Sequence, residues 1–239
     1  MPLAFVSGAG IRVGRAIALE FARSGYDVIC HAHASLDGAN ATAQDISALG
    51  RRAHVVRADL ADADAVDALG ETLVATHDTL DVVVHNAAIF EERSFEDINR
   101  AAYRRMQAIN VEAPFFLTQA LLPALRRAEA PSVIAVVDIA GERPIKRHAH
   151  YCISKAALSM MLRSLALEIA PIRVNGVAPG AVAFPADYDE NKRARILARV
   201  PLAREGTMSD LARAVRFLAE NQYITGQILA VDGGRGVTL

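Results

Sequence analysis

Short apolar runs alternate with longer amphipathic stretches along the whole chain. Runs that are short enough for buried strands lie at Leu3 to Ser7, Asp27 to His33, Arg52 to Arg57, Asp81 to His85, Ser132 to Asp138, Ile172 to Val177 and Gln227 to Val231. Stretches with helical periodicity lie at Gly14 to Ser24, Asp62 to Thr76, Arg100 to Arg127, Ala149 to Ala170 and Met208 to Glu220. The alternation predicts an α/β fold, a Rossmann-like doubly wound parallel sheet of seven strands with helices on both faces.

The alternation continues without a linker, so a single domain over residues 1–239 is expected. A chain of 239 residues that is 52% hydrophobic can fill one large core. Pro114 lies inside the third helical stretch and predicts a bend there. Residues 183–207 are polar and weakly patterned, which indicates a substrate flap rather than a linker.

Charge and cysteine content narrow the class of partner. Formal net charge is −1, from 26 basic and 27 acidic residues, so nothing indicates a nucleic acid or an anionic membrane as partner. Cys30 and Cys152 fall in a strand and a helix, which favours two reduced thiols over a disulfide. The first expected strand begins at Leu3, and no apolar run is as long as a membrane span. We therefore expect a cytoplasmic protein, and its partners are expected to be small molecules.

A glycine triplet follows the first expected strand. In "FVSGAGIRVGRAIALEF", Gly8, Gly10 and Gly14 stand between that strand and a helix. Backbone N–H groups and the helix dipole can meet a pyrophosphate at such a junction. A tight turn with a purely structural role is the alternative interpretation.

The Gly-x-Gly-x-x-x-Gly spacing resembles the loop of short-chain dehydrogenases/reductases, and further motifs follow in that family's order. Asn86-Ala87 ends the fourth strand, Asn110 lies inside a helix, and Tyr151-x-x-x-Lys155 opens the next long helix. "RVNGVAPG" and "ITGQILAVDGG" come after them. The resemblance therefore covers the chain from end to end and implies a dinucleotide cofactor.

No metal is expected, because no carboxylate or thiol at useful spacing completes a site with His31 and His33. The family resemblance also implies which residues contact the cofactor. The expected cofactor contacts are Gly8, Gly10, Arg12, Val13, Gly14, His33, Ser35, Asp59, Leu60, Asn86, Ala87, Tyr151, Lys155, Pro179, Gly180 and Val182.

NADPH is favoured over NADH by the end of the second strand. An acidic residue there would bind the ribose 2′-hydroxyl of NAD, but "CHAHAS" offers His33 and Ser35 and no carboxylate before Asp37. Ala34 adds no positive charge at this point, so binding of the 2′-phosphate is expected to depend on His33, Ser35 and Arg12.

The expected catalytic residues are Asn110, Asp138, Tyr151 and Lys155. Tyr151 would supply the proton that accompanies hydride transfer. Lys155, one helical turn on, is expected to favour the phenolate by its charge. The family resemblance adds that this lysine grips the nicotinamide ribose and that Asn110 holds a water.

Asp138 stands thirteen residues before Tyr151, where the family usually has serine. A serine hydroxyl would donate to a carbonyl oxygen, whereas an ionised carboxylate only accepts hydrogen bonds. The replacement therefore disfavours a plain ketone and favours a substrate with N–H groups, or a C=N bond that takes up a proton on nitrogen. Loss of the catalytic serine in a degenerate enzyme is the alternative.

An aspartate at this position resembles pteridine reductases and, more closely, bacterial dihydromonapterin reductases. In them an arginine like Arg12 lies over the cofactor phosphates, and an aromatic residue like Phe90 stacks on the pterin. The expected substrate contacts are Arg12, Phe90, Asp138 and Tyr151. A solvated arginine and a core phenylalanine are the simpler interpretations of Arg12 and Phe90.

The sequence thus predicts an NADPH-dependent reductase of a dihydropterin, such as dihydromonapterin or dihydrofolate, with hydride added to a ring carbon and a proton to a ring nitrogen. One alternative is a reductase of the same fold acting on another carbonyl or imine. Another is a non-catalytic NADP(H)-binding sensor. The family resemblance also implies a homotetramer or homodimer, formed through the helices that carry Asn110 and Tyr151.

Overall fold

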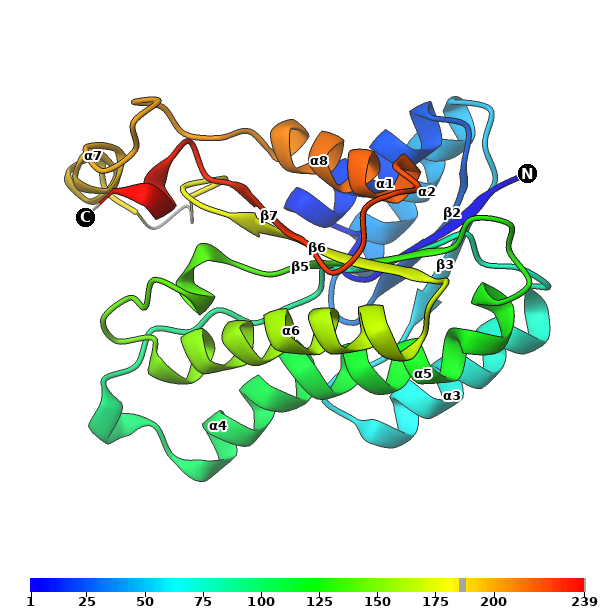
Figure 1. The fold of residues 1–239 in the computed structure, drawn as a ribbon, viewed down its shortest axis with the longest axis horizontal. Coiled ribbons are helices and arrows are strands. Elements are labelled where there is room, and N and C mark those ends of the chain that lie inside the picture. Colours follow the sequence, from blue (N-terminus) through cyan, green and yellow to red (C-terminus); the bar gives the residue numbers. More distant parts are fainter. Residues whose placement is uncertain (185–187, 239) are drawn as a thin grey trace.

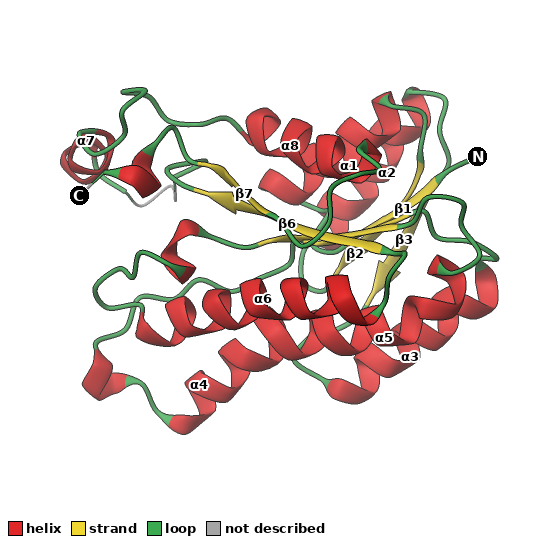
Figure 2. Ribbon diagram, in the orientation of Figure 1, coloured by secondary structure: helices red, strands yellow, loops and turns green. Residues whose placement is uncertain are grey.

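One parallel sheet organises the molecule. The computed structural model describes residues 1–184 and 188–238. The strands pair in the order β3-β2-β1-β4-β5-β6-β7, all parallel, as predicted (Figures 1 and 2). The strands are β1 (Leu3–Val6), β2 (Asp27–Ala32), β3 (Ala53–Arg57), β4 (Val82–His85), β5 (Ser132–Val136), β6 (Arg173–Pro179) and β7 (Ile228–Val231).

Helices cover both faces of this sheet. The helices are α1 (Arg12–Arg23), α2 (Leu36–Ala48), α3 (Ala63–Thr76), α4 (Arg100–Gln107), α5 (Ala113–Leu125), α6 (Ala149–Glu168), α7 (Glu190–Leu197) and α8 (Met208–Glu220). In Figure 2, α1, α2 and α8 lie on one side, and α3, α4, α5 and α6 on the other. The described chain therefore forms the three layers of a doubly wound fold.

Two cores result, because successive strand residues point to opposite faces. On β1, Phe5 joins the core under α3, α5 and α6, whereas Val6 joins the core under α1 and α8. On β5, Val133 joins the same core as Phe5, and Ile134 joins the same core as Val6. Burial on both faces explains why the central strands read as continuous apolar runs in the sequence.

The amino end of β2 holds a buried acid. The Asp27 carboxylate is only 4% exposed, and it forms ion pairs with Arg51 at 2.9 Å and Arg52 at 2.7 Å. It also accepts a hydrogen bond from the Arg52 backbone N–H. These donors outweigh the cost of burial, so the pKa of Asp27 falls to about 2.

The third helical stretch of the sequence is not one regular helix. A π-turn over Ala108–Glu112 separates α4 from α5, and Pro114 stands in the first turn of α5. A proline at 114 has no N–H to donate to the carbonyl of Asn110, so regular α-helical bonding cannot continue there. The disturbance that Pro114 predicts is therefore present, as a π-turn just ahead of the proline.

Two helices were not expected from the pattern. In α2 only Ala39, Thr42 and Ile46 are buried, and in α7 no residue is buried, so neither shows a strong apolar stripe. Helix α7 lies within residues 183–207, where a flap is expected. Residues 185–187 of that flap lie outside the described residues.

The helical stretch Arg100–Leu125 has the length and the apolar composition of a helix that could cross a membrane. Half of the most apolar window is buried inside the protein, and α5 packs against α3. A core helix of a globular fold meets the same criterion.

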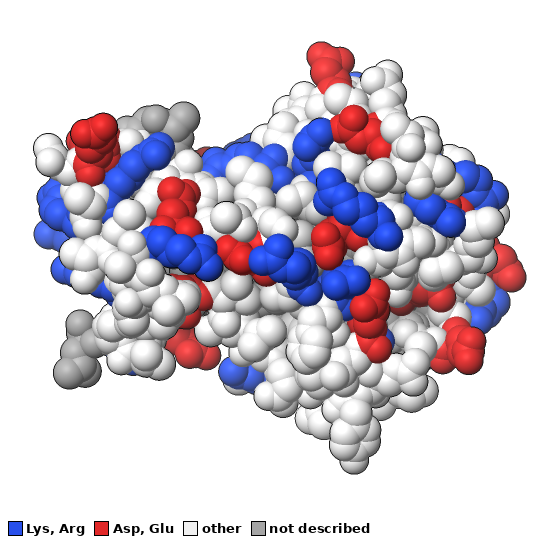
Figure 3. All heavy atoms as spheres, turned by 90° about the horizontal axis from the view of Figure 1, so that it is seen from above, with Lys and Arg blue, Asp and Glu red and all other residues white. Residues whose placement is uncertain are grey.

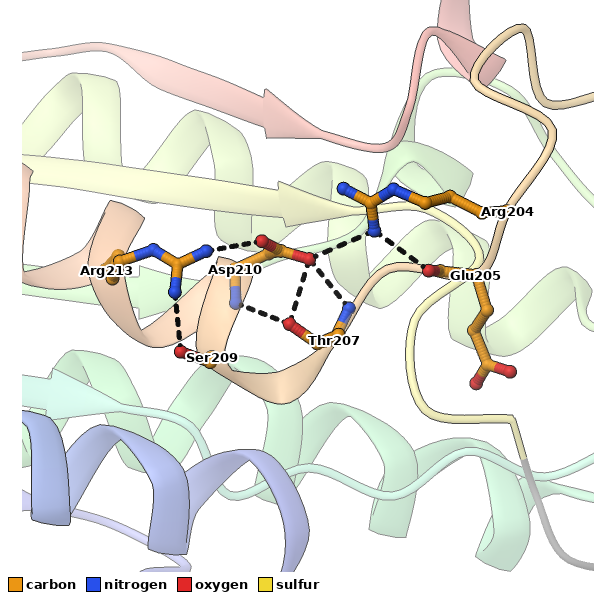
Figure 4. Close-up of polar contacts among 6 residues, drawn as sticks. All are labelled: Arg204, Glu205, Thr207, Ser209, Asp210 and Arg213. Carbon is orange, nitrogen blue, oxygen red and sulfur yellow. Dashed lines mark hydrogen bonds and ion pairs between the residues drawn. The ribbon is translucent and has the colours of Figure 1, made fainter.

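Helix α8 begins with a capping box, shown in Figure 4. Thr207 Oγ1 accepts from the Asp210 N–H at 3.1 Å, and the Asp210 carboxylate accepts from the Thr207 N–H at 2.8 Å. Arg204 and Arg213 form ion pairs with the same carboxylate at 3.4 and 2.6 Å. The start of α8, where the expected flap ends, is thereby fixed.

Candidate active site

A cleft of about 1310 Å³ opens at the carboxyl ends of the strands. It spans the point between β1 and β4 where the chain reverses its direction of travel across the sheet, the usual ligand site of this architecture. The loops after β1, β2, β4, β5 and β6 all contribute to its walls.

The glycine loop after β1 needs its glycines. Gly8 has a φ of +67°, and a Cβ on Gly14 would lie 2.0 Å from the Gly8 carbonyl oxygen. Ile11 precedes α1 and provides no side-chain cap, so the first N–H groups of the helix remain open toward the cleft. Bare backbone and an uncapped helix start fit a pyrophosphate at this point.

Buried polar groups hold this loop from behind. His31 accepts from the Gly8 N–H at Nδ1 (3.3 Å), and its Nε2 lies 3.2 Å from the Ala58 carbonyl. Burial lowers the pKa of His31 to about 4, so the ring is neutral and Nε2 carries the donated proton. Thr42 Oγ1 donates to the Ala9 carbonyl at 3.1 Å, which ties α2 to the loop.

Asn86 and Ala87 join the end of β4 to the same turn. The Asn86 amide donates to the Ser7 carbonyl at 2.9 Å, and Ser7 Oγ accepts from the backbone N–H groups of Asn86 and Ala87. Both residues line the cleft, where the sequence places cofactor contacts.

The end of β2 provides the other predicted cofactor contacts. His33 and Ser35 line the cleft, and His33 Nδ1 lies 3.5 Å from Asp59 Oδ1. Asp59 also accepts from the Ala61 N–H at 2.9 Å, whereas Leu60 is buried. Neither Asp59 nor Leu60 is among the described residues that line the cleft, so their contact with the cofactor stays a prediction.

Asp138 and Tyr151 meet in the cleft. The Tyr151 hydroxyl donates to Asp138 Oδ2 at 2.7 Å, and Asp138 Oδ1 accepts from the Ala140 N–H at 2.8 Å. Asp138 follows β5 and Tyr151 lies in the first turn of α6, so two separate elements bring these side chains together. The carboxylate acts as acceptor in both contacts, as the sequence predicts for an aspartate at this place.

Burial and Asp138 outweigh any effect of the Lys155 charge on the Tyr151 hydroxyl in this arrangement. Burial raises the pKa of Tyr151 well above its ordinary value, and the negative charge of Asp138 and its hydrogen bond with the hydroxyl raise it further. A second negative charge beside the carboxylate is unfavourable. Tyr151 therefore stays protonated and remains a proton donor at neutral pH.

Lys155 is buried behind the tyrosine. Its ammonium donates to the Val136 carbonyl at 2.9 Å and lies 5.7 Å from the centre of the Tyr151 ring. Burial lowers the pKa of Lys155 to about 8, although the charge of Asp138 acts in the opposite direction. The Lys155 ammonium therefore loses its proton only a little above neutral pH.

Asn110 lies in the π-turn and holds the strand-to-loop segment after β4. Its Oδ1 accepts from the Ile89 N–H at 3.0 Å, and its Nδ2 donates to the Ile89 carbonyl at 3.1 Å. The same amide donates to Ser154 Oγ at 3.0 Å. Asn110 therefore fixes the backbone next to Phe90 and connects it to α6.

Phe90 forms an aromatic edge to the site. Its ring lies 4.8 Å from Tyr151 at 87° and stacks on His148 at 4.5 Å and 24°. It is 44% exposed and lines the cleft, so it is not the core residue of the simpler interpretation.

Arg12 reaches across the cleft from the glycine loop. Its guanidinium donates to the Ala183 carbonyl in the segment after β6. Gly180 and Val182 line the cleft beside it, and Pro179 is the last residue of β6. A Cβ on Gly180 would lie 2.5 Å from the Asp232 side chain, so the backbone passes close to the end of β7.

Sequence reasoning missed several basic side chains in the cleft. They are Arg143, Lys146, Arg147, Lys192, Arg195, Arg199 and Arg235. No local motif marks them, because they come from three separate segments. Within residues 1–184 and 188–238, no group of three or more His, Cys, Asp or Glu side chains is arranged to hold a metal ion.

The cleft combines a glycine loop that can bind a pyrophosphate with the hydrogen-bonded pair of Tyr151 and Asp138. This combination is typical of a dinucleotide-dependent oxidoreductase. A family profile described as "Enoyl-(Acyl carrier protein) reductase" matches residues 8–235. The chain belongs to the short-chain dehydrogenase/reductase family and is an NAD(P)-dependent oxidoreductase of that family.

Similar proteins in the family have several substrates. The chain is 36% identical to L-rhamnose 1-dehydrogenase (NAD(P)(+)) of Azotobacter vinelandii, over 98% of this chain and 96% of that one. It is 34% identical to 3-oxoacyl-(acyl-carrier-protein) reductase of Staphylococcus aureus, over 97% and 96%. The prediction of the family is confirmed. None of these relatives is named for a pterin substrate, so a pterin as the substrate of this chain remains a proposal.

Two solved structures share the fold closely. One is FolM alternative dihydrofolate reductase 1 from Brucella canis in complex with NADP, with a TM-score of 0.92 and 31% identity over 100% of this chain and 95% of that one. The other is a blue fluorescent protein from a metagenomic library in complex with NADPH, with a TM-score of 0.90 and 33% identity over 98% and 97%.

Proposed function

We propose that this enzyme reduces a dihydropterin, such as dihydromonapterin or dihydrofolate, with NADPH. The observation that supports it most directly is the 2.7 Å hydrogen bond from Tyr151 to Asp138, where the family usually has a serine. An ionised carboxylate cannot donate to the oxygen of a ketone as it becomes an alkoxide. It can accept from the N–H groups of a pterin, while the Tyr151 hydroxyl delivers a proton to a ring nitrogen.

The cofactor is NADPH, in agreement with the prediction and with the NADP(H) complexes of the similar structures. The glycine loop and the open start of α1 would hold its pyrophosphate, and His33 and Ser35 would lie at its 2′-phosphate. When bound, this cofactor supplies the hydride.

The residues of the site would divide the remaining work. Tyr151 keeps its proton at Oη, and Asp138 orients that hydroxyl and accepts from substrate N–H groups. Lys155 holds its charge beneath the tyrosine. Phe90 presents an aromatic face next to Tyr151, which suits a flat heteroaromatic ring.

A substrate panel tests the proposal. NADPH oxidation is measured with dihydromonapterin and dihydrofolate, and in parallel with acetoin, a short 3-oxoacyl thioester and a cyclic imine. We expect a kcat/KM for a dihydropterin that is at least 100-fold above that for the ketones. Brisk ketone reduction without pterin turnover would favour the general carbonyl reductase, and NADPH binding without turnover of any substrate would favour the sensor.

Assembly and location belong to the same proposal. Several large apolar side chains on α4, α5 and α6 are exposed, among them Phe116 at 44%, Ile153 at 50% and Met160 at 60%. An exposed apolar surface of this kind supports a homotetramer or homodimer formed through these helices. A cytoplasmic location agrees with a reductase that draws on NADPH.

A further inference from the structure

The cleft carries far more positive charge than the molecule as a whole. Its described lining includes eight Lys or Arg side chains and only two carboxylates, Glu92 and Asp138, although the chain has a formal net charge of −1. A concentration of one sign of charge in a cleft attracts ligands of the opposite sign. The basic lining is therefore a local property of the cleft.

Two of the eight cations pair with a carboxylate of the cleft, and a third, Arg12, belongs to the glycine loop. Arg147 and Lys192 share Glu92, at 2.7 and 3.8 Å, and Arg12 donates to the Ala183 carbonyl. The second carboxylate, Asp138, is taken up by Tyr151. Among the described residues, neither carboxylate of the cleft forms an ion pair with any of the other five cations.

The other five form what we term the basic cluster: Arg143, Lys146, Arg195, Arg199 and Arg235. Within the described part of the chain, none of the five forms an ion pair with a carboxylate. The nearby Asp232 carboxylate accepts instead from the backbone N–H groups of Gly234 and Gly236. Four of the five are arginines, the side chain that binds phosphate and carboxylate groups in a bidentate manner.

Backbone contacts bring the three segments of the basic cluster together. The Arg143 N–H donates to the carbonyl of Ile139, which follows Asp138, at 2.8 Å. A Cβ on Gly236 would lie 4.0 Å from the Ile139 side chain, so the C-terminal segment also runs beside the residue that follows Asp138. Thr238 Oγ1 donates to the Arg199 carbonyl at 3.3 Å, which joins that segment to the end of α7.

The basic cluster is separate from the part of the cleft that suits the cofactor phosphates. Its members follow β5, β6 and β7, whereas the glycine loop and the His33 region follow β1 and β2, on the other half of the sheet. Figure 3 shows Lys and Arg side chains gathered on the lobe at the left of the view, which contains α7. Asp138 also follows β5, so the catalytic carboxylate lies on the same half of the sheet as the basic cluster.

We propose that the substrate carries an anionic group, a phosphate ester or a carboxylate, on the part of the molecule remote from the reduced ring, and that the basic cluster binds this group. The proposal rests on the proposed function and extends it from dihydropterins in general to those with an anionic side chain. A neutral polyol side chain would leave five cations in the cleft without a counter-charge.

The test compares three dihydropterins: dihydromonapterin, its phosphate ester and dihydrofolate, which carries carboxylates. At low ionic strength we expect kcat/KM for one of the two anionic substrates to exceed that for dihydromonapterin at least tenfold, mainly through KM. Because salt screens exposed charges, the advantage should shrink severalfold in 0.5 M KCl. The two anionic substrates distinguish phosphate from carboxylate as the recognised group.

The double variant Arg199→Gln/Arg235→Gln should lose at least tenfold more kcat/KM on the preferred anionic substrate than on dihydromonapterin. Arg126→Gln is the matched control, because Arg126 is an exposed arginine after α5, outside the cleft. It should change neither value by more than twofold.

Failure of this proposal can be told apart from failure of the proposed function. Equal or better use of dihydromonapterin would overturn the anion site and leave the pterin reductase intact. If no dihydropterin is turned over, titration of the NADPH-bound enzyme with folate and with neutral pterin decides: tighter, salt-sensitive folate binding that the double variant loses supports the site, and equal binding overturns it. Turnover only of a substrate carried on an acidic protein would also overturn it.

Discussion

The 2.7 Å contact between Tyr151 and Asp138 determines how the site can handle a proton. A tyrosine with a raised pKa donates its proton only to a group that becomes basic during the reaction. A ring nitrogen that gains electron density is such a group. The contact between Tyr151 and Asp138 therefore bears on which double bond is reduced. It does not identify the rest of the substrate.

Replacing the carboxylate tests this chemistry directly. Asp138→Ser replaces the charged acceptor of Tyr151 and of substrate N–H groups with a neutral hydroxyl that also donates, so we expect kcat for dihydropterin reduction to fall at least 100-fold. The Kd for NADPH, measured by fluorescence titration, should change less than threefold because the glycine loop is untouched. Tyr151→Phe is the control for loss of the proton donor. Undiminished turnover by the serine variant would contradict the role of Asp138.

The pH dependence should report Lys155. Its pKa of about 8 predicts that kcat/KM decreases as the pH rises through about 8, because the ammonium loses its proton, whereas Tyr151 titrates higher. The charge of Asp138 raises the pKa of Lys155, so Asp138→Asn should move this limb to lower pH. Rates between pH 6 and 10 measure both. A limb that stays in place would show that another group titrates there.

At the scale of elements, β2 is fixed at its amino end by the buried Asp27. A folded pKa of about 2, below the ordinary 3.8, means that this carboxylate stabilises the fold above pH 4 and loses the effect as the pH falls toward 2. Asp27→Asn should therefore lower the free energy of unfolding by about 2 kcal/mol at pH 7. Urea denaturation at pH 7 and pH 3 should show a smaller difference at pH 3.

Asp45→Asn provides the control for this stability change. Asp45 pairs with Arg15 on the surface, with both side chains nearly half exposed, so its loss should cost less than about 1 kcal/mol. An Asp27 variant as stable as the wild type at pH 7 would contradict the structural role of the buried carboxylate.

Regular elements with a strong apolar pattern could be predicted from the sequence, and weakly patterned ones could not. All seven strands lie where the apolar runs place them. Burial on both faces leaves little room for polar residues in the inner strands, whereas the edge strands β3 and β7 are only partly buried. Helices α2 and α7 bury few or no side chains, so their sequences carry little periodicity. The π-turn at Asn110 depends on bonding that a hydrophobic pattern does not record.

At the scale of the whole molecule, the site was predictable only where a local motif marks it. The glycine loop and the Tyr151–Lys155 spacing carry their own signature, and they lie in or behind the cleft wall as expected. The basic cluster has no signature, because the segments of Arg143, Arg199 and Arg235 come together only once the crossovers from β5 to β6 and from β6 to β7 have folded.

The exposed face of α5 and α6 gives a prediction on assembly. Phe116→Glu combined with Ile153→Glu places charges on this apolar surface and should reduce the mass measured by light scattering after size-exclusion chromatography. Tyr223→Glu, at a fully exposed residue between α8 and β7, should leave the mass unchanged. An unaltered mass of the double variant would place any interface elsewhere.

The close approach of Gly14 to Gly8 constrains how coenzyme preference could be redesigned. Even an alanine at 14 would put its Cβ 2.0 Å from a carbonyl oxygen of the preceding turn, so this position admits no side chain without rebuilding the loop. Ala34 is exposed at the end of β2 and has room to vary. An engineer who wants to exchange NADPH for NADH should therefore place an acidic residue at 34 and leave the glycines as they are.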